Sequence, residues 1–344
     1  MRGRQREAGA SRTEGVLHGF LPRVLLGNAP ASRPFSRCVT LVKHEPVMVR
    51  EVVAALAGEA AGRYVDGTLG EGGHARALLE TLGAEARLLG LDRDPGAVQA
   101  AREALSAYGP RAQVLHGRFA QLAEHLTLLG WPAVDGILLD LGLRSDALDD
   151  PERGFSYRTD GPLDMRFDPT HGRSAAELLR RMPPDRLLHL LEAGTTRADP
   201  RAITRVILDA RRRDALRSTG DLVACLRGGL GRRTTPKLLA SVFATLRMAV
   251  NEELEELDRA LATMPALLKT GGVLCVIAYQ SQEDRRAKGL GRAECVDPTT
   301  GRCFRMLPLW HGPRRPSAAE AVSNSRARSA RLRAFRRSPP TDAS

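Results

Sequence analysis

The sequence has few aromatic residues and few cysteines, and it has no long apolar run. Aromatic residues make up 4% of the 344 positions, so exposed rings that stack on bases are not expected to dominate nucleic-acid binding. The five cysteines include no C-x-x-C pair, which fits neither a zinc site nor a secreted disulfide framework. We therefore expect no metal and a reducing compartment. No apolar run approaches the roughly 18 residues of a membrane span, so no membrane partner is expected.

Positive charge is concentrated at the two ends of the chain. The net charge is +12, of which residues 1–43 carry +6 and residues 312–344 carry +6, so the stretch between them is neutral. The first segment is rich in Arg with few acids and lacks the apolar core of a secretory signal, which is typical of an organellar transit peptide. The alternative is a disordered leader without a targeting signal. We expect the mitochondrial matrix, or otherwise a plastid, and a basic C-terminal tail over residues 312–344.

The middle of the chain alternates short apolar strands with helices. Strands are predicted at residues 64–66, 88–91, 113–115 and 136–139, with helices between them. This alternation predicts an α/β fold, a Rossmann-like doubly wound parallel sheet with helices on both faces. After Asp140 the pattern changes to short helices with basic surfaces, and an apolar strand returns at residues 273–277. We therefore predict a sheet domain over 44–145 and 243–311, interrupted by a helical domain over 146–242.

A glycine-rich turn follows the first predicted strand. It runs D-G-T-L-G-E-G-G-H from Asp66 to His74, and Asp92 lies 22 residues after Gly70, at the end of the next strand. Glycines there allow a close approach of the backbone to a ligand, and an acid at this spacing binds ribose hydroxyls. Asp66 and Glu71 would repel a pyrophosphate but suit the ammonium and sulfonium of S-adenosylmethionine, which is the cofactor we predict.

Two further residues fall at the carboxyl end of predicted strands. Asp140 ends the fourth strand, where doubly wound sheets bind ligands. Phe119 follows the third strand and could lie against an adenine, although an ordinary core position explains it equally well. Asp140 is also the predicted catalytic residue, because its carboxylate could accept a hydrogen bond from a substrate amine and orient it.

Several motifs in order resemble one known family. They are His44-Glu45-Pro46-Val47-Met48, the Asp66–His74 turn, Asp92-Arg93-Asp94-Pro95, Asp140-Leu141-Gly142, the stretches 148–156 and 160–166, and the Arg-rich stretch 326–333. In these the chain resembles the RsmH (MraW) family of small-subunit ribosomal RNA cytosine-N4 methyltransferases, including its mitochondrial relatives. The resemblance covers about residues 44–335. The motifs around 149–155 and 160–166 are the most specific ones.

The resemblance implies a catalytic domain with an inserted helical substrate-recognition domain. It also implies methylation of one cytidine in small-subunit rRNA, either free or in the assembling subunit. Carried over by position, the cofactor contacts are Gly70, Gly72, Gly73, His74, Asp92, Phe119 and Asp140. The candidate substrate contacts are Asp160 and Asp164 at the base edge, Arg166, and Arg326 and Arg328, together with Arg331 and Arg333, at phosphates. For Asp160 and Asp164 a structural role in the Gly-Pro turn is an equal alternative.

Some positions depart from the family pattern. Ala147 replaces a glutamine expected to bond the cofactor, and Ala278-Tyr279-Gln280-Ser281 replaces Ser-Phe-His-Ser. Thr195-Thr196 follows Gly194 where the family has two glutamates, and residues 239–244 keep little of another conserved stretch. These changes leave a second hypothesis open, a catalytically weak or inactive ribosome-assembly factor that binds rRNA. A nicotinamide-dependent oxidoreductase is the third, disfavoured by the acids in the glycine turn.

Overall fold

The computed structural model describes residues 46–58, 61–195, 199–324 and 326–341. The predicted transit peptide, residues 1–43, lies outside the described residues. The described part belongs to one compact unit that spans residues 44–344. Within it, no helix is both long enough and apolar enough to cross a membrane.

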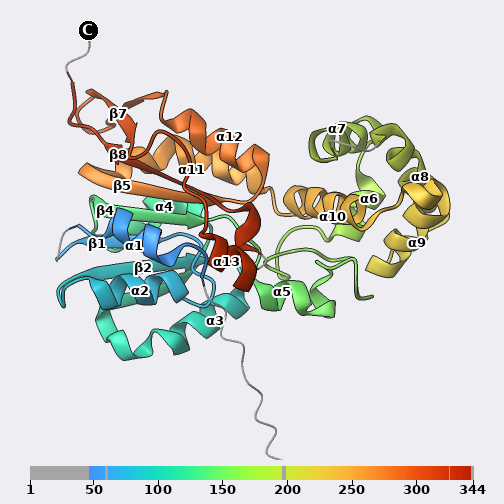
Figure 1. The fold of residues 1–344 in the computed structure, drawn as a ribbon, viewed down its shortest axis with the longest axis horizontal. Helices are drawn as coiled ribbons and strands as arrows, with labels where there is room; N and C mark the ends of the chain where they lie inside the picture. The colour runs from blue at the N-terminus through green and yellow to red at the C-terminus, as the bar shows by residue number, and fades with distance from the viewer. Residues whose placement is uncertain (1–45, 59–60, 196–198, 325, 342–344) are drawn as a thin grey trace, which may run out of the picture. The chain divides into compact units, whose positions relative to one another are not determined.

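An eight-stranded sheet has a parallel half and an antiparallel half, in the order β3-β2-β1-β4-β5-β8-β7-β6 (Figure 1). The five parallel strands are β1 (Arg63–Asp66), β2 (Arg87–Asp92), β3 (Ala112–His116), β4 (Val134–Asp140) and β5 (Leu268–Ala278). Chain order reverses direction across β1 and β4, the switch point of a doubly wound sheet. The predicted α/β class and Rossmann-like fold are therefore confirmed.

Alternate residues of β5 enter different cores, which shows that both faces of the sheet are covered. Val273, Cys275 and Ile277 pack in one apolar cluster, whereas Leu274 and Val276 pack in the other. Such alternation follows from the two-residue period of a strand. The first cluster includes residues of α1 (Val49–Leu56) and α2 (Gly73–Thr81), and α3 (Pro95–Ala104) also contributes Ala101 to it. The second includes α4 (Leu122–Leu128), α11 (Glu253–Leu267) and α12 (Ser281–Leu290).

The antiparallel half corrects the expectation of a loosely held C-terminal tail. Strand β8 (Arg331–Arg337) lies between β5 and β7 (Cys303–Pro308), and β6 (Glu294–Val296) pairs with β7. Leu332, Ala334 and Phe335 are buried, so alternating arginines in this segment belong to a strand with an apolar face rather than to a tail. The short helix α13 (Ala318–Ser323) precedes β8, and its Glu320 Oε1 accepts a hydrogen bond from Met48 N at 2.7 Å.

A helical segment separates β4 from α11 and has a core of its own. It comprises α5 (Ser145–Asp149), α6 (Ala175–Arg181), α7 (Pro184–Gly194), α8 (Pro200–Arg212), α9 (Thr219–Leu230) and α10 (Pro236–Val250). Ser174, Ser218 and Thr235 start α6, α9 and α10 by accepting a backbone N–H with their hydroxyls, as N-caps do. Phe243 and Leu246 lie in this core, so the helical segment continues to the end of α10 rather than ending at 242.

Five short 3-10 turns complete the described chain. They are η1 (Ser106–Arg111), η2 (Phe119–Gln121), η3 (Pro151–Arg153), η4 (Gly231–Arg233) and η5 (Ala327–Ser329). Of these, η2 and η5 matter most for the site, because η2 follows β3 directly and η5 begins beside Arg326.

Candidate functional site

The glycine turn after β1 has the backbone shape that its glycines permit. Gly70 has φ 55° and Gly72 has φ 80°, a left-handed conformation that costs other residues energy. Gly67 N donates to Leu138 O at 2.9 Å, and a Cβ atom added to Gly67 would lie 2.8 Å from the Leu139 side chain. The turn therefore lies tightly against the end of β4, and Gly73 and His74 begin α2 directly after it.

Hydrogen bonds to Asp92 stabilise this turn. Its Oδ2 accepts a hydrogen bond from Gly70 N at 2.8 Å, and its Oδ1 accepts one from Asp94 N at 2.8 Å. Burial raises the pKa of Asp92, and the two backbone N–H groups oppose that rise. Each carboxylate oxygen has a second lone pair, so the predicted contact to ribose hydroxyls remains chemically available and stays a prediction.

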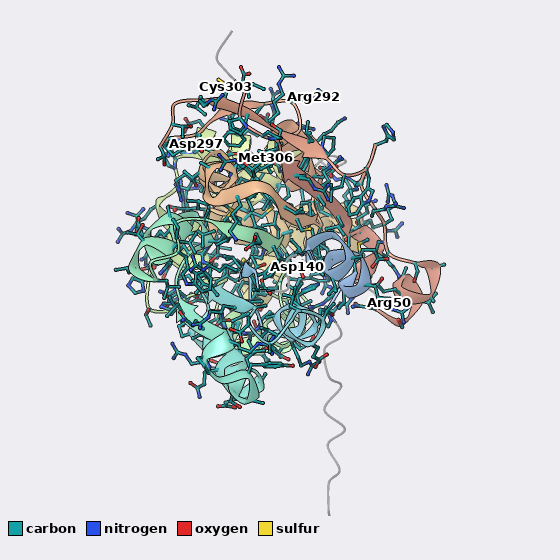
Figure 2. The ribbon with its side chains drawn as sticks, turned by 90° about the vertical axis from the view of Figure 1, so that its left-hand side faces the viewer. Arg50, Asp140, Arg292, Asp297, Cys303 and Met306 are labelled. Carbon is teal, nitrogen blue, oxygen red and sulfur yellow. The ribbon has the colours of Figure 1, made fainter. Side chains whose placement is uncertain are left out.

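Asp140 lies at the end of β4, beside the same turn, and is labelled near the middle of Figure 2. Its backbone N–H donates to Thr68 Oγ1 at 2.6 Å. Its side chain is 20% exposed, so the carboxylate can be reached from solvent. The Tyr279 hydroxyl donates a hydrogen bond to Asp140, and burial with this carboxylate raises the pKa of the Tyr279 phenol, which therefore stays protonated.

His74 lies behind Asp140 and is buried. Its Nε2 lies 2.9 Å from Val47 O, and its Nδ1 lies 3.9 Å from Asp140 Oδ2. Asp66, at the end of β1, is also buried, and this burial raises its pKa to about 7 while His74 acts to lower it. Of the four ionisable side chains at this end of the sheet, Asp66, Asp92 and Asp140 are acids and His74 is the fourth. This end of the sheet therefore favours cationic ligands.

Phe119 lies at the same end of the sheet. It is the first residue of η2, and its Cβ would be 3.1 Å from a Cβ added to Gly67. The structure thus brings together the predicted cofactor residues, and it does so with side chains from β1, β2, β4, α2 and η2. The adenine contact of Phe119 stays a prediction.

The two most specific motifs meet at Arg153, which also contacts Asp94. Asp94 caps α3 by accepting a hydrogen bond from Gly96 N, and its Oδ2 accepts one from Arg153 NH1 at 3.0 Å. Arg153 NH2 also donates to Arg166 O at 3.2 Å and to Phe167 O at 2.9 Å. One guanidinium therefore ties the segment 160–167 to the helix that follows Asp92.

The predicted base-reading residues are held by local contacts. Asp160 Oδ1 accepts hydrogen bonds from Gly220 N at 2.7 Å and from Gly161 N at 3.1 Å, next to the start of α9. Asp164 pairs with Arg166, through Oδ1 to Nε at 2.9 Å and Oδ2 to NH2 at 2.6 Å. These contacts match the structural alternative for the two acids, and they leave the substrate role of all three residues as a prediction.

The C-terminal arginines divide into two kinds. Arg331 NH1 and Arg333 Nε donate to Asp284 at 3.2 and 2.8 Å, so the expectation that these two bind phosphates is replaced by an internal ion-pair role. Arg328 is exposed, and its Nε donates to Ala321 O at 3.1 Å. Arg326 is half-buried, and burial lowers its pKa while Tyr279 and Asp140 raise it. Arg326, predicted as a substrate contact, is thus a neighbour of Tyr279 and Asp140.

Two of the residues that depart from the family pattern, Ala147 and Tyr279, have defined surroundings in the structure. Ala147 is buried in the core of the helical segment. Tyr279 packs its ring against Gly142, where an added Cβ would lie 2.9 Å from Tyr279 Cε2. Sequence reasoning noted Tyr279 as a departure but missed its hydroxyl contact with Asp140. The sequence signal for this contact was the hydroxyl that Tyr279 adds where the family has phenylalanine, directly after the last parallel strand.

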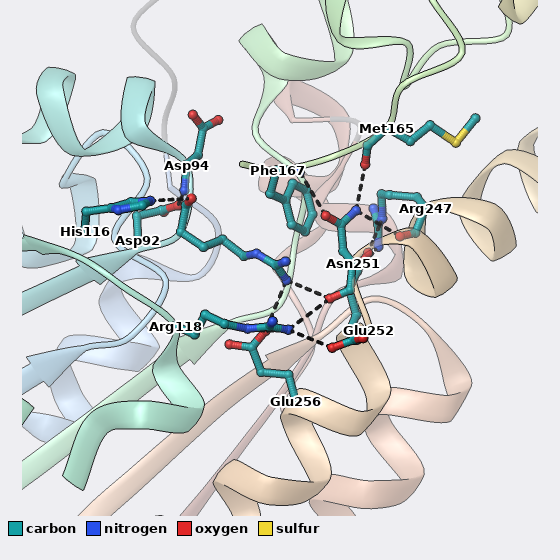
Figure 3. A network of polar contacts seen from close by, with 12 residues as sticks. Asp92, Asp94, His116, Arg118, Met165, Phe167, Arg247, Asn251, Glu252 and Glu256 are labelled. Carbon is teal, nitrogen blue, oxygen red and sulfur yellow. Dashed lines mark hydrogen bonds and ion pairs between the residues drawn. The ribbon is translucent and has the colours of Figure 1, made fainter. Parts of the chain in front are cut away.

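A second polar network lies beside the site and was not predicted (Figure 3). Glu256, on α11 and fully buried, pairs with Arg93 at 3.1 Å and with Arg118 at 3.0 Å. Both arginines also donate to Asn251 O, at 2.8 and 3.4 Å. Asn251 lies at the end of α10, so the network joins the loops after β2 and β3 to the end of the helical segment.

The residues present fit S-adenosylmethionine. The glycine turn, Asp92, Phe119 and Asp140 are the groups that would hold it, and the surplus of acids suits its two positive charges. Asp66 Oδ2 is buried without a hydrogen-bond partner in the described chain. In the described part of the chain, no group of three or more His, Cys, Asp and Glu residues is arranged to hold a metal ion.

Comparison with known proteins decides the family. The MraW methylase family matches residues 41–338. The chain belongs to this family. Its cofactor is therefore S-adenosylmethionine, as the charge of the glycine turn predicted.

Two relatives with similar sequences agree with this assignment. The chain is 42% identical over 86% of its length to ribosomal RNA small subunit methyltransferase H of Thermomicrobium roseum, covering 93% of that protein. It is 41% identical over 86% of its length to the protein of the same name from Sorangium cellulosum, covering 91% of it. A solved rRNA methylase from Streptococcus thermophilus is 10% identical over 85% of this chain and 94% of that chain, with a TM-score of 0.36.

Proposed function

We propose that this protein transfers a methyl group from S-adenosylmethionine to the exocyclic N4 amine of a cytidine in the small-subunit rRNA of an organelle. The observation that carries this proposal is the position of Asp140. Its solvent-accessible carboxylate lies beside the acid-lined glycine turn of a chain from the MraW methylase family. The rRNA substrate is supported by relatives named for small-subunit rRNA methylation.

The chemistry asks two things of the protein. A cytosine amine is a poor nucleophile because its lone pair is conjugated with the ring, so the nitrogen must be held in line with the methyl group. Positioning of this kind can supply about 7–11 kcal/mol of barrier reduction. Asp140 can accept a hydrogen bond from the amine and orient its lone pair. The target base must also leave its stack to reach the site.

Binding of the cofactor is the first test. We expect calorimetric titration of the chain lacking residues 1–43 to show micromolar binding of S-adenosylmethionine. Asp92→Ala should abolish this binding, because the change also removes the carboxylate that accepts the hydrogen bond from Gly70 N. Asp135→Ala is the matched control, since Asp135 pairs with Lys269 and Arg63 N at the opposite, amino end of the strands.

Analysis of the methylated product distinguishes the methyltransferase hypothesis from the assembly-factor hypothesis. Organellar small-subunit rRNA from depleted cells should lose N4-methylcytidine, and added protein should restore it on isolated subunits or on naked rRNA. Cofactor binding without any product, together with co-purification with small subunits, would favour the assembly factor. A folded sample that binds no cofactor would contradict the enzyme.

Localisation rests on the leader. We expect residues 1–43, fused to a fluorescent protein, to direct it to mitochondria, because the segment is Arg-rich and poor in acids. Import into plastids would support the alternative organelle. A diffuse signal would contradict an organellar address.

A further inference from the structure

The hydrogen bond of His74 to the backbone determines which ring nitrogen carries a proton. A carbonyl oxygen only accepts, so the 2.9 Å contact with Val47 O requires a proton on Nε2. In the neutral ring, Nδ1 then has a free lone pair. That lone pair is on the side of Asp140, whose Oδ2 is 3.9 Å away. The buried ring therefore presents a proton acceptor to the carboxylate that is exposed to substrate.

Two acids lie near the ring of His74. Asp140 lies on one side, and Asp66, at the end of β1, is close enough that the two side chains influence each other electrostatically. The other polar groups near this pair are Asp92, the Tyr279 hydroxyl, which stays protonated, and the Arg326 guanidinium, which opposes positive charge.

Methylation of an amine must dispose of one proton. When the new nitrogen–carbon bond forms, the methyl–sulfur bond breaks and its electron pair remains on sulfur. The nitrogen then carries a positive charge until it loses a proton. Asp140 is the group placed to take that proton. Behind this carboxylate, the buried His74 ring offers a second acceptor at Nδ1, 3.9 Å from Asp140 Oδ2.

We propose that His74 accepts, through Asp140, the proton that the target amine loses. This inference rests on the proposed function and adds a role that cofactor contact alone does not require. The 3.9 Å separation is longer than a hydrogen bond, and catalytic contacts of this kind commonly tighten only when substrate binds. After transfer, Asp140 is again a carboxylate and His74 is an imidazolium between two acids.

The test compares His74→Gln with the wild type in single-turnover methylation between pH 5.5 and 9. The glutamine amide nitrogen can replace Nε2 as the donor to Val47 O, but no titrating atom remains at Nδ1. The wild-type rate should rise with pH and level off. The variant should be slower by about 100-fold, the lower end of the usual range for general bases, and should lose that rise.

Two controls distinguish proton transfer from a structural effect. His189→Gln alters an exposed histidine of α7 that also bonds a carbonyl, Asp185 O at 2.8 Å, and should keep the wild-type rate and pH profile. Asp66 titrates in the same range, because burial raises its pKa to about 7. Asp66→Asn should therefore be slower yet keep a pH-dependent rate.

Two further readouts do not depend on turnover. Cofactor affinity measured by calorimetry should fall much less than the methylation rate in His74→Gln. Nitrogen NMR of labelled histidine should show that the neutral ring of His74 carries its proton on Nε2 and none on Nδ1.

The outcomes separate this inference from the proposed function. A His74→Gln protein with wild-type rate and pH profile overturns the inference, and so does a loss of cofactor affinity as large as the loss of rate. If no wild-type methylation of rRNA is found, the proposed function fails. The NMR result then still decides whether Nδ1 is available as an acceptor beside Asp140: a neutral His74 ring with its proton on Nδ1 overturns the inference.

Discussion

Asn251 Nδ2 donates a hydrogen bond to Met165 O at 2.7 Å, which joins two residues 86 positions apart. The same amide accepts a hydrogen bond from Phe167 N at 2.8 Å through its Oδ1. Met165 has φ 62°, a left-handed conformation that is uncommon for a residue with a side chain. Asn251 is buried and lies in the network of Figure 3. One side chain therefore holds the 160–167 motif in its conformation.

Asn251→Ala should destabilise the protein. The change leaves Met165 O and Phe167 N buried without partners, at a cost of about 2–3 kcal/mol. Urea unfolding should show a lower midpoint with an unchanged slope. Gln99→Ala, which removes an exposed amide on α3, should cost far less. Equal losses in the two variants would contradict the anchoring role of Asn251.

Stability should fall as pH rises through neutrality. Burial raises the pKa of Glu283 to about 7, against the opposing hydrogen bonds from Gln280 N and Tyr279 N and the charge of Arg247. The folded state then holds this proton more tightly than the unfolded chain, whose carboxyl has its ordinary pKa. Its contribution is fully present below about pH 4.5 and is lost as pH rises through 7. Asp66, raised to about 7 by burial, acts in the same direction.

Glu283→Gln isolates this effect. The variant keeps an oxygen that can accept both backbone hydrogen bonds but cannot ionise. Its free energy of unfolding should depend less on pH between 5 and 8, by up to about 3 kcal/mol. Glu294→Gln, at an exposed position on β6, should keep the wild-type slope. A wild-type stability that rises over this range would show that Glu283 ionises as readily in the folded state.

Tyr279→Phe should speed methyl transfer. The Tyr279 hydroxyl occupies a lone pair of Asp140, which weakens that carboxylate as an acceptor for a substrate amine. The phenyl ring can keep its contact with Gly142, so stability should change little. We expect a single-turnover rate about threefold higher, with Tyr157→Phe as the control, because Tyr157 packs against Phe243 in the helical segment. A tenfold loss would show instead that the hydroxyl orients Asp140.

Arg328 and Arg333 should behave differently on substitution by glutamine. Arg333 pairs with Asp284 inside the fold, so Arg333→Gln should lower the melting temperature and leave rRNA affinity close to wild type. Arg328 is exposed, so Arg328→Gln should leave the melting temperature unchanged and weaken rRNA binding. It should also reduce the slope of log affinity against log salt by about one, as expected for one phosphate contact. The reverse pattern would contradict the two assignments.

The sequence alone determined the fold class, the cofactor and the position of the glycine turn. These depend on local patterns: strand and helix periods, glycines at positive φ, and acids at a set distance from Gly70. The sequence did not show that residues 331–337 form a strand, because alternating arginines resemble a solvated tail until Leu332, Ala334 and Phe335 are placed against the sheet.

Tertiary structure alone decided which charged side chains face substrate and which face each other. Arg331 and Arg333 pair with Asp284, 47 and 49 residues away. The Tyr279 hydroxyl and His74 Nδ1 meet at Asp140 from different elements. Such contacts depend on how β4, β5 and α2 are placed side by side in the sheet and its layers. Charge and motif spacing, which act along the chain, do not contain that information.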